Sequence, residues 1–207
     1  MPFLRLVILG SVLLNGSALA QRWMPYSNTL DGFRLMAPGA FEIEEIDFET
    51  EYGIVVPARI YSHVNDVGRF SVTVVDYRDS QRLHEERIRE LDGVYIGIYG
   101  QVDVRGSVAY AAKKIRDRAS TIEYDAYHYI SRVDGHQLQT TNPDQTRTFA
   151  AIYLRESRLY VVDATVAANT TPPGMFQQSL EFVDEDGDLI RYQNFRDVYK
   201  VSGVIER

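Results

Sequence analysis

The chain has 207 residues and no cysteine, which excludes disulfides, thiolate zinc sites, cysteine nucleophiles and a cysteine-linked lipid anchor. Its 29 acidic and 22 basic residues give a formal charge of −7, which argues against nucleic acid and anionic lipid as partners. A domain of this length buries enough apolar surface to fold without disulfides.

The first twenty residues have the organisation of a secretory signal peptide. Arg5 is their only charged residue, and an apolar run from Leu6 to Leu14 follows it. Ala18-Leu19-Ala20 is the small-x-small pattern that a signal peptidase requires, so we expect cleavage after Ala20. The apolar run is much shorter than the about 20 residues that span a bilayer, so no membrane anchor is expected after cleavage. The expected mature protein is one domain over 21–207, periplasmic or secreted, with a loose tail over about the last ten residues.

The first half of this domain predicts a meander of antiparallel strands. A short apolar segment over 33–36 ends at the turn residues Pro38-Gly39. Strands are predicted over 41–48, 54–61 and 70–77, where polar and apolar residues alternate.

Two positions interrupt this strand pattern. The doubled Glu44-Glu45 breaks the alternation by one residue and predicts a bulge. Pro57 predicts an edge position or a bulge for its strand, because proline lacks the N–H that a ladder needs.

Helices are predicted next. The first begins at Asp79 or Ser80 and runs to about residue 91. Its apolar stripe consists of Leu83, Ile88 and Leu91. Residues 94–104 are ambiguous between strand and connection, and Ser107 is expected to cap a second helix over 107–118.

Strands then return over 121–133, 137–141, 147–154 and 159–166. Asp134-Gly135 is a hairpin signal. The last two strands are continuously apolar, which predicts that they form the buried centre of the sheet.

The end of the chain predicts one more helix. Thr171 and Pro172 suit its first positions, and Gly187 suits its end. Apolar residues recur between them at helical spacing, namely Met175, Phe176, Leu180 and Val183. A final edge strand is expected over 189–195.

Taken in order, the chain alternates between runs of strands and groups of helices. Hairpin connections make the sheet antiparallel, and helices grouped between strand runs indicate an α+β fold. The fold class predicted from the residues is therefore α+β, an antiparallel sheet with helices packed on its faces.

Four segments resemble a known family. They are FRLMAPGAF (33–41), GRFSVTVVDYRD (68–79), RLYVVDATV (158–166) and FQQSLEF (176–182). Together they are similar to PsbP/Mog1-like domains, in an exported bacterial form. The resemblance implies an α/β/α sandwich around an antiparallel sheet. The named members of this family are non-catalytic: they are extrinsic proteins of the photosynthetic oxygen-evolving complex and a factor that binds a small GTPase of nuclear transport. No functional residue of these relatives is matched in this sequence, so the resemblance implies a fold and not a function.

Tyrosine is enriched in the middle of the chain, and this side chain supplies large, rigid, amphipathic contact area. The leading hypothesis is therefore an exported, non-catalytic binding or accessory module without a cofactor. Its partner would be an unidentified protein or small ligand of the cell envelope. The predicted contact surface consists of Tyr95, Tyr99, Tyr127, Tyr129 and His128.

Two alternatives stay open. The first is a hydrolase-like envelope enzyme with a dispersed acid–base site, in which His128 works with Asp125 or Glu123. No GxSxG elbow, phosphate loop or paired-histidine zinc motif is present to support it.

The second alternative is a cation-dependent assembly protein. Asp184, Asp186 and Asp188 are candidate metal ligands, because hard cations bind converging carboxylates. The glycine of this run does not occupy the position that an EF-hand loop requires, and a solvated helix end explains the run equally well.

Overall fold

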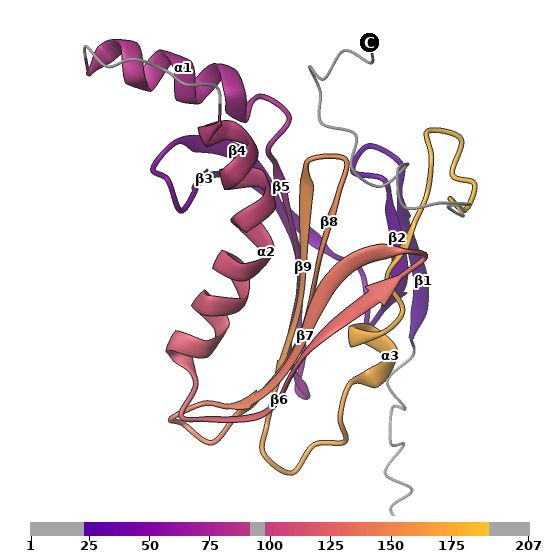
Figure 1. Cartoon of the computed structure of the whole chain (residues 1–207). Coiled ribbons are helices and arrows are strands. Elements are labelled where there is room, and N and C mark those ends of the chain that lie inside the picture. The colour runs from indigo at the N-terminus through magenta and orange to yellow at the C-terminus, as the bar shows by residue number, and fades with distance from the viewer. Residues whose placement is uncertain (1–22, 92–97, 191–207) are drawn as a thin grey trace, which may run out of the picture.

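The computed structural model describes residues 23–91 and 98–190. Within them the chain forms ten strands and three helices, arranged around one large sheet (Figure 1). Four of the features expected from the sequence lie outside the described residues: the expected signal peptide over 1–20, Tyr95, most of the strand over 189–195, and the tail. No helix in the described ranges has the length and apolar character needed to cross a membrane.

The first half contains β1 (Met24–Asn28), β2 (Phe33–Ala37), β3 (Glu42–Glu49), β4 (Val55–Val64) and β5 (Gly68–Asp76). The helices α1 (Ser80–Glu90) and α2 (Tyr99–Arg118) follow. The second half contains β6 (Thr121–Ile130), β7 (Val133–Thr141), β8 (Arg147–Arg155), β9 (Arg158–Val166), α3 (Gly174–Gln177) and β10 (Glu181–Phe182).

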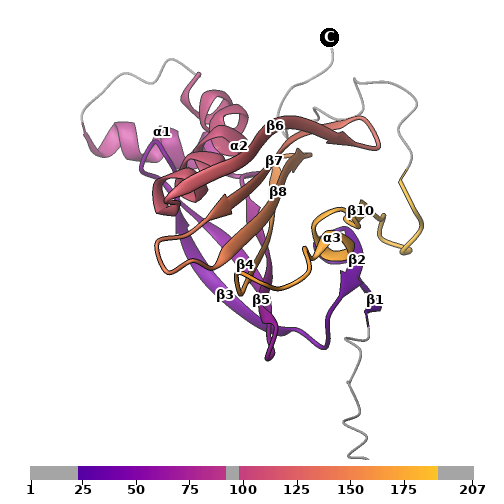
Figure 2. The same cartoon turned by 90° about the horizontal axis from the view of Figure 1, so that it is seen from below.

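The large sheet has seven strands in the order β3-β4-β5-β9-β8-β7-β6, and every neighbouring pair is antiparallel. The α+β prediction is confirmed. The prediction that β8 and β9 lie at the centre is also confirmed, since β9 is the fourth of seven strands and nearly all of β8 is buried. A second sheet of three strands, β1-β2-β10, lies against the face of the large sheet opposite α2 (Figure 2).

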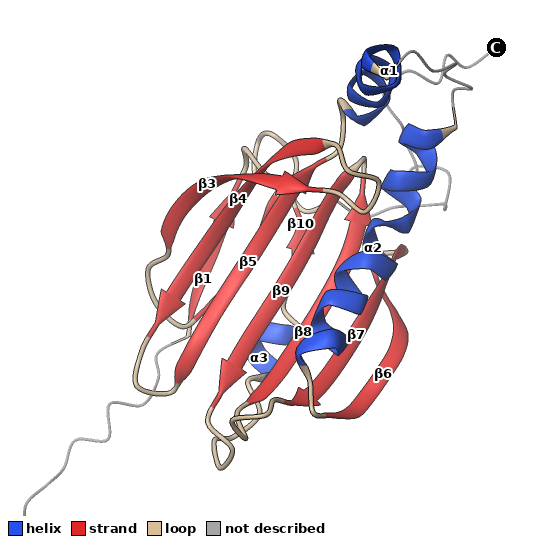
Figure 3. Cartoon of the chain, turned by 90° about the vertical axis from the view of Figure 1, so that its left-hand side faces the viewer, coloured by secondary structure: helices blue, strands red, loops and turns tan. Residues whose placement is uncertain are grey.

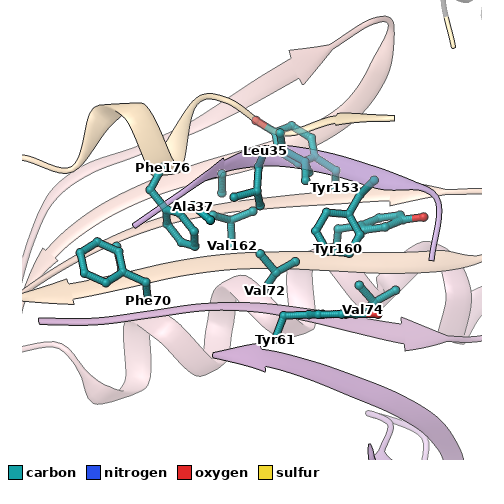
Figure 4. Packing of buried hydrophobic residues seen from close by; sticks show 14 of the residues in the cluster. Leu35, Ala37, Tyr61, Phe70, Val72, Val74, Tyr153, Tyr160, Val162 and Phe176 are labelled. Carbon is teal, nitrogen blue, oxygen red and sulfur yellow. The ribbon is translucent and has the colours of Figure 1, made fainter. Parts of the chain in front are cut away.

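The face that packs against the small sheet and α3 carries an aromatic core (Figure 4). Phe33 of β2 and Tyr61 of β4 meet edge to face, with ring centroids 5.1 Å apart. Phe70 of β5 meets Phe176 of α3 in the same way at 5.4 Å. Edge-to-face contacts add to the area that such rings bury, so this core ties the small sheet to the large one.

A buried ion pair closes one end of this core. Asp31, in the turn between β1 and β2, accepts hydrogen bonds from Arg59 at 2.6 Å and from the Tyr61 hydroxyl at 2.5 Å. The Tyr160 hydroxyl donates to the Asp31 carbonyl at 2.8 Å. Burial and this carboxylate raise the pKa of Tyr61, so its hydroxyl remains a donor.

The opposite face carries a second core beneath α2. Ala111, Ala112 and Ile115 of α2 pack on Ile152 and Leu159 of the central strands. The helix runs over β7 and β8 and leaves the β3-β4-β5 side of this face without a helix (Figure 3).

Helix α1 packs on α2 and not on the sheet. A Cβ at Gly100 would lie 2.8 Å from the Gln81 Cα atom, so only glycine permits this close crossing of the two helices. The predicted apolar stripe of α1 is right in part: Leu83 packs against the core and Ile88 is half-buried, but Leu91 is 71% exposed and the fully buried side chains are Ser80 and His84.

Two strand expectations are wrong. The pairing of β3 with β4 runs without interruption through Glu44-Glu45, so Ile43 lies on the face of its partner Tyr61, opposite Ile46, and is 55% exposed on this edge strand. Pro57 belongs to β4, which is not an edge strand, because β3 lies outside it at the edge of the sheet. Pro57 is tolerated because the β4–β5 ladder begins one residue later, at Ala58.

The second helix begins earlier than expected. Ser107 lies inside α2 and not at its cap, and its hydroxyl donates to the Val104 carbonyl at 2.7 Å. A serine can satisfy its hydroxyl on the preceding turn, so its presence does not mark a helix start.

The hairpin turn and the last helix also differ from the prediction. The β6–β7 turn is Ser131-Arg132, whose φ angles are 47° and 65°, and Asp134-Gly135 lies within β7. The last helix is a single turn, after which Phe182 pairs with Phe33 as a strand. Tertiary pairing with β2 outweighs the helical spacing of Phe176, Leu180 and Val183.

Candidate ligand-binding groove

A groove of about 700 Å³ lies between α2 and the adjacent parts of β6, β7 and β8. Its volume is in the range of small-molecule sites. Five lining residues come from α2, namely Arg105, Val108, Ala109, Ala112 and Arg116. The strands contribute Tyr127, Asp134, Gly135, His136 and Leu154.

Local periodicity produces this lining. The α2 residues are spaced by three and four positions, so they share one helix face. On the hairpin, Tyr127 pairs with His136 and Tyr129 pairs with Asp134, which places all four side chains on the side of α2. The helix supplies an apolar floor and the strands supply the polar rim.

An ion-pair network forms one wall. Arg116 Nε donates to Asp125 Oδ2 at 2.6 Å, and a second guanidinium N–H donates to Oδ1 at 2.9 Å. This two-bond fork orients both groups. The Arg116 hydrogen bonds, followed by the contact with His136, lower the pKa of Asp125 to about 2. Asp125 is therefore ionised at neutral pH.

His136 is oriented by this carboxylate. Its Nε2 atom contacts Asp125 Oδ1 and lies 3.3 Å from an Arg116 nitrogen. We assign the Nε2 proton to the bond with ionised Asp125, because an arginine nitrogen cannot accept it. In the neutral ring Nδ1 is then the acceptor.

The opposite wall is aromatic. The Tyr127 hydroxyl donates to Asp134, and this hydrogen bond raises the pKa of Tyr127. Tyr127 and Tyr129 are each 62% exposed, and their ring centroids are 6.3 Å apart. Arg105 lies at the edge of the groove and has no ion-pair partner among the described residues. The groove thus offers an apolar floor, aromatic contact area and one free cation.

The structure divides the contact surface predicted from the sequence. Tyr127 lines the groove and Tyr129 is beside it. Tyr99 is at the start of α2, where its ring lies 6.3 Å from His84, and it does not line the groove. His128 points to the other face of the sheet, where a ring nitrogen lies 2.9 Å from the Tyr153 hydroxyl. Burial lowers the pKa of His128.

The acid–base pair expected at His128 does not form. Asp125 pairs with His136 and Arg116, and Glu123 accepts a hydrogen bond from Thr141 at 2.5 Å. Because successive strand residues point to opposite faces, Asp125 and His128 lie on different sides of the sheet. Sequence reasoning missed His136, since its partners come from β6 and α2 and no local motif marks it.

The acidic loop, expected as a candidate cation site, folds into a tight turn. Asp184 Oδ1 accepts the backbone N–H groups of Asp186 at 3.1 Å and Asp188 at 2.9 Å, so it folds its own turn. Gly187 has a φ of 86° and completes this turn between strand-like segments, not at a helix end. Among residues 23–91 and 98–190, no three His, Asp or Glu side chains gather in a group that fits a metal ion.

Comparison with known proteins gives a structural likeness but no sequence match. No family model matches the sequence, and no curated protein matches it. The solution structure of cyanobacterial PsbP (CyanoP) from Synechocystis sp. PCC 6803 covers 84% of this chain and 99% of its own. The two are 10% identical, with a TM-score of 0.45. No residue role is transferred at this similarity, so the groove is interpreted from its own geometry.

Proposed function

We propose that this protein is an exported, non-catalytic binding module that holds an amphipathic ligand or partner segment in the groove between α2 and β6–β7. The observation that supports it is the groove itself, with an apolar floor and a rim whose polar groups are already oriented by one another. A preformed site loses little conformational entropy on binding. Export is proposed from the N-terminal sequence pattern described above.

Contact area supports this proposal more than any single polar group. Tyr127 and Tyr129 present large exposed rings at the rim of the groove. Exposed tyrosines beside an apolar floor are typical of binding surfaces, because each ring gives apolar area and a polar tip at low entropic cost.

Site-specific photocrosslinking tests the proposal. A photoreactive phenylalanine analogue is placed at Tyr127 or Arg105 in the native host, and at Ile43 on the far edge of the sheet as a matched exposed control. We expect a discrete adduct from the two groove positions and none from Ile43. Equal labelling from all three positions, or no adduct from the groove, contradicts the assignment.

A groove-filling variant provides the second arm. Ala109→Trp places a large ring in the groove at an exposed helix position, whereas Lys113→Trp adds the same ring to α2 outside it. We expect the Arg105 adduct to disappear with Ala109→Trp and to persist with Lys113→Trp.

An acid–base enzyme is the second candidate, favoured by the His136–Asp125 contact in the groove. The Asp125 carboxylate holds Nε2 of His136, and Nδ1 of the same ring remains available as a base. The groove lining contains no serine or threonine nucleophile, so water would be the attacking group. A substrate screen that finds turnover in the wild type and none in His136→Phe would establish this candidate in place of the binding module.

A further inference from the structure

A second groove, of about 630 Å³, lies on the other flank of α2. It shares no lining residue with the candidate groove. It occupies the face of β5 and β9 that no helix covers (Figure 3). The second groove is therefore a separate site, and a ligand there would not depend on the candidate groove.

The floor of this second groove is polar, although it lies on the inner strands of the sheet. Across the β5–β9 ladder, Ser71 pairs with Asp163 and Arg69 pairs with Thr165. Thr73 is on the same face of β5, because residues two apart in a strand point the same way. A face of an antiparallel sheet that no helix covers normally carries polar side chains, so this floor is a wetted surface beside the apolar flank of α2.

Two hydroxyl groups of the floor are free. Ser71 and Thr73 make no side-chain hydrogen bond with any residue of the described ranges. Asp163 accepts Thr165 on Oδ1 at 3.2 Å and Arg118 on Oδ2, and each carboxylate oxygen can accept one further hydrogen bond. The floor therefore offers both donors and acceptors to a ligand rich in hydroxyl groups.

Basic side chains border this floor. Arg69 is exposed and has no carboxylate partner among the described residues. The Lys114 ammonium lies 4.6 Å from the Phe48 ring centroid and 4.4 Å from that of Tyr110, without a carboxylate partner in the same ranges. Arg118 is paired with Asp163. Asp144 also lines the groove, so its lining carries three cations and two carboxylates. This net positive lining in a chain of net charge −7 indicates a ligand with negative charge.

Apolar side chains complete the groove. They are Phe48, Ile60, Ala111, Ile115 and Val161. The C–H face of a sugar ring packs against such a surface while its hydroxyl groups reach polar side chains. A fatty acid would leave the hydroxyl groups of the floor unused, and inorganic phosphate would leave the apolar wall unused.

We propose that this groove binds a small polyhydroxylated carboxylate of the sugar-acid class. Ser71, Thr73 and Asp163 take the ring hydroxyls. Arg69 and Lys114 take the carboxylate, and the apolar wall packs on the ring.

Titration calorimetry with D-glucuronate tests the proposal on the purified protein. We expect glucuronate to bind, and glucose to bind at least tenfold more weakly because it lacks the charge. Arg69→Gln and Lys114→Met should each weaken glucuronate binding by roughly tenfold, the usual effect of losing one charge-assisted bond. Lys113→Met, one residue away and outside the groove, should bind as the wild type does.

Several results would overturn the proposal. These are no binding of glucuronate, equal affinity for glucose, equal affinity for inorganic phosphate, or an equal loss in Lys113→Met. Thermal unfolding of each variant shows whether it is folded. Tyr127→Ala, in the other groove, should leave glucuronate binding unchanged, which separates this test from that of the proposed function.

Discussion

The His84 Nε2 atom lies 2.9 Å from Asp103 Oδ2, and the two side chains are 4% and 1% exposed. Asp103 Oδ2 also accepts the Thr50 hydroxyl at 2.6 Å. One carboxylate therefore ties α1, α2 and the end of β3 together. This contact explains why the buried face of α1 includes a histidine beside the half-buried Leu83.

Removing this carboxylate should destabilise the fold. Asp103→Ala leaves His84 and Thr50 buried without their partner, and each buried polar group left unsatisfied costs about 1–3 kcal/mol. Urea denaturation measures the free energy of unfolding. Asp117→Ala removes an exposed carboxylate of the same helix and should cost less than about 1 kcal/mol. Equal effects of the two substitutions would contradict the importance of the buried contact.

The Arg116–Asp125 fork predicts a pH dependence at acid pH. The folded pKa of Asp125, about 2, is below its usual value of 3.8, so the unfolded chain binds the proton more readily. The stabilisation is fully present above about pH 4 and is lost as the pH falls toward 2. Unfolding free energies measured across this range should decline less steeply in Asp125→Asn than in the wild type. Parallel curves for the wild type and Asp125→Asn would show that Asp125 does not contribute to the pH dependence of stability.

The buried ring of His128 leads us to expect a second pH dependence of stability, nearer neutral pH. Burial holds its pKa below the usual 6.5, so the folded state favours the neutral ring. Its stabilisation is present above about pH 6.5 and is lost as the pH falls through the folded pKa. Titration of the ring by NMR should give a midpoint below 6.5, while a midpoint above it would contradict the assigned environment.

The β6–β7 turn offers a stabilising substitution. Ser131 and Arg132 both have positive φ, the geometry of a type I′ turn, which Asn-Gly adopts with less strain. The double change Ser131→Asn and Arg132→Gly should raise the free energy of unfolding by about 0.5–1 kcal/mol. Gly135→Ala should lower it, because a Cβ there would collide with the Ile152 carbonyl. A stabilising Gly135→Ala would contradict the close contact of Gly135 with β8.

Export is tested by the mature N-terminus. Protein recovered from the envelope fraction of its native host should begin at Gln21, as the Ala18-Leu19-Ala20 pattern predicts. Ala20→Arg introduces a large side chain at the cleavage position and should leave the precursor uncut. A chain that keeps Met1 in the wild type would contradict the signal peptide.

The sequence by itself determined the fold class and the centre of the sheet. Strand periodicity and apolar runs are local properties, and β5, β8 and β9 follow them closely. The alternation of side chains along β6 also puts Tyr127 and Tyr129 on one face. Where local preference was weak, tertiary contact decided, as when pairing with Phe33 converted the end of the predicted last helix into a strand.

Only the tertiary structure decided the sites. The candidate groove joins Arg116 of α2, Asp125 of β6 and His136 of β7, and the second groove joins Arg69 of β5 to Lys114 of α2. These residues carry no motif, because their spacing in the sequence is set by the packing of α2 across the sheet. A sequence pattern reports the face on which a side chain lies, whereas its neighbours on other elements depend on how those elements pack.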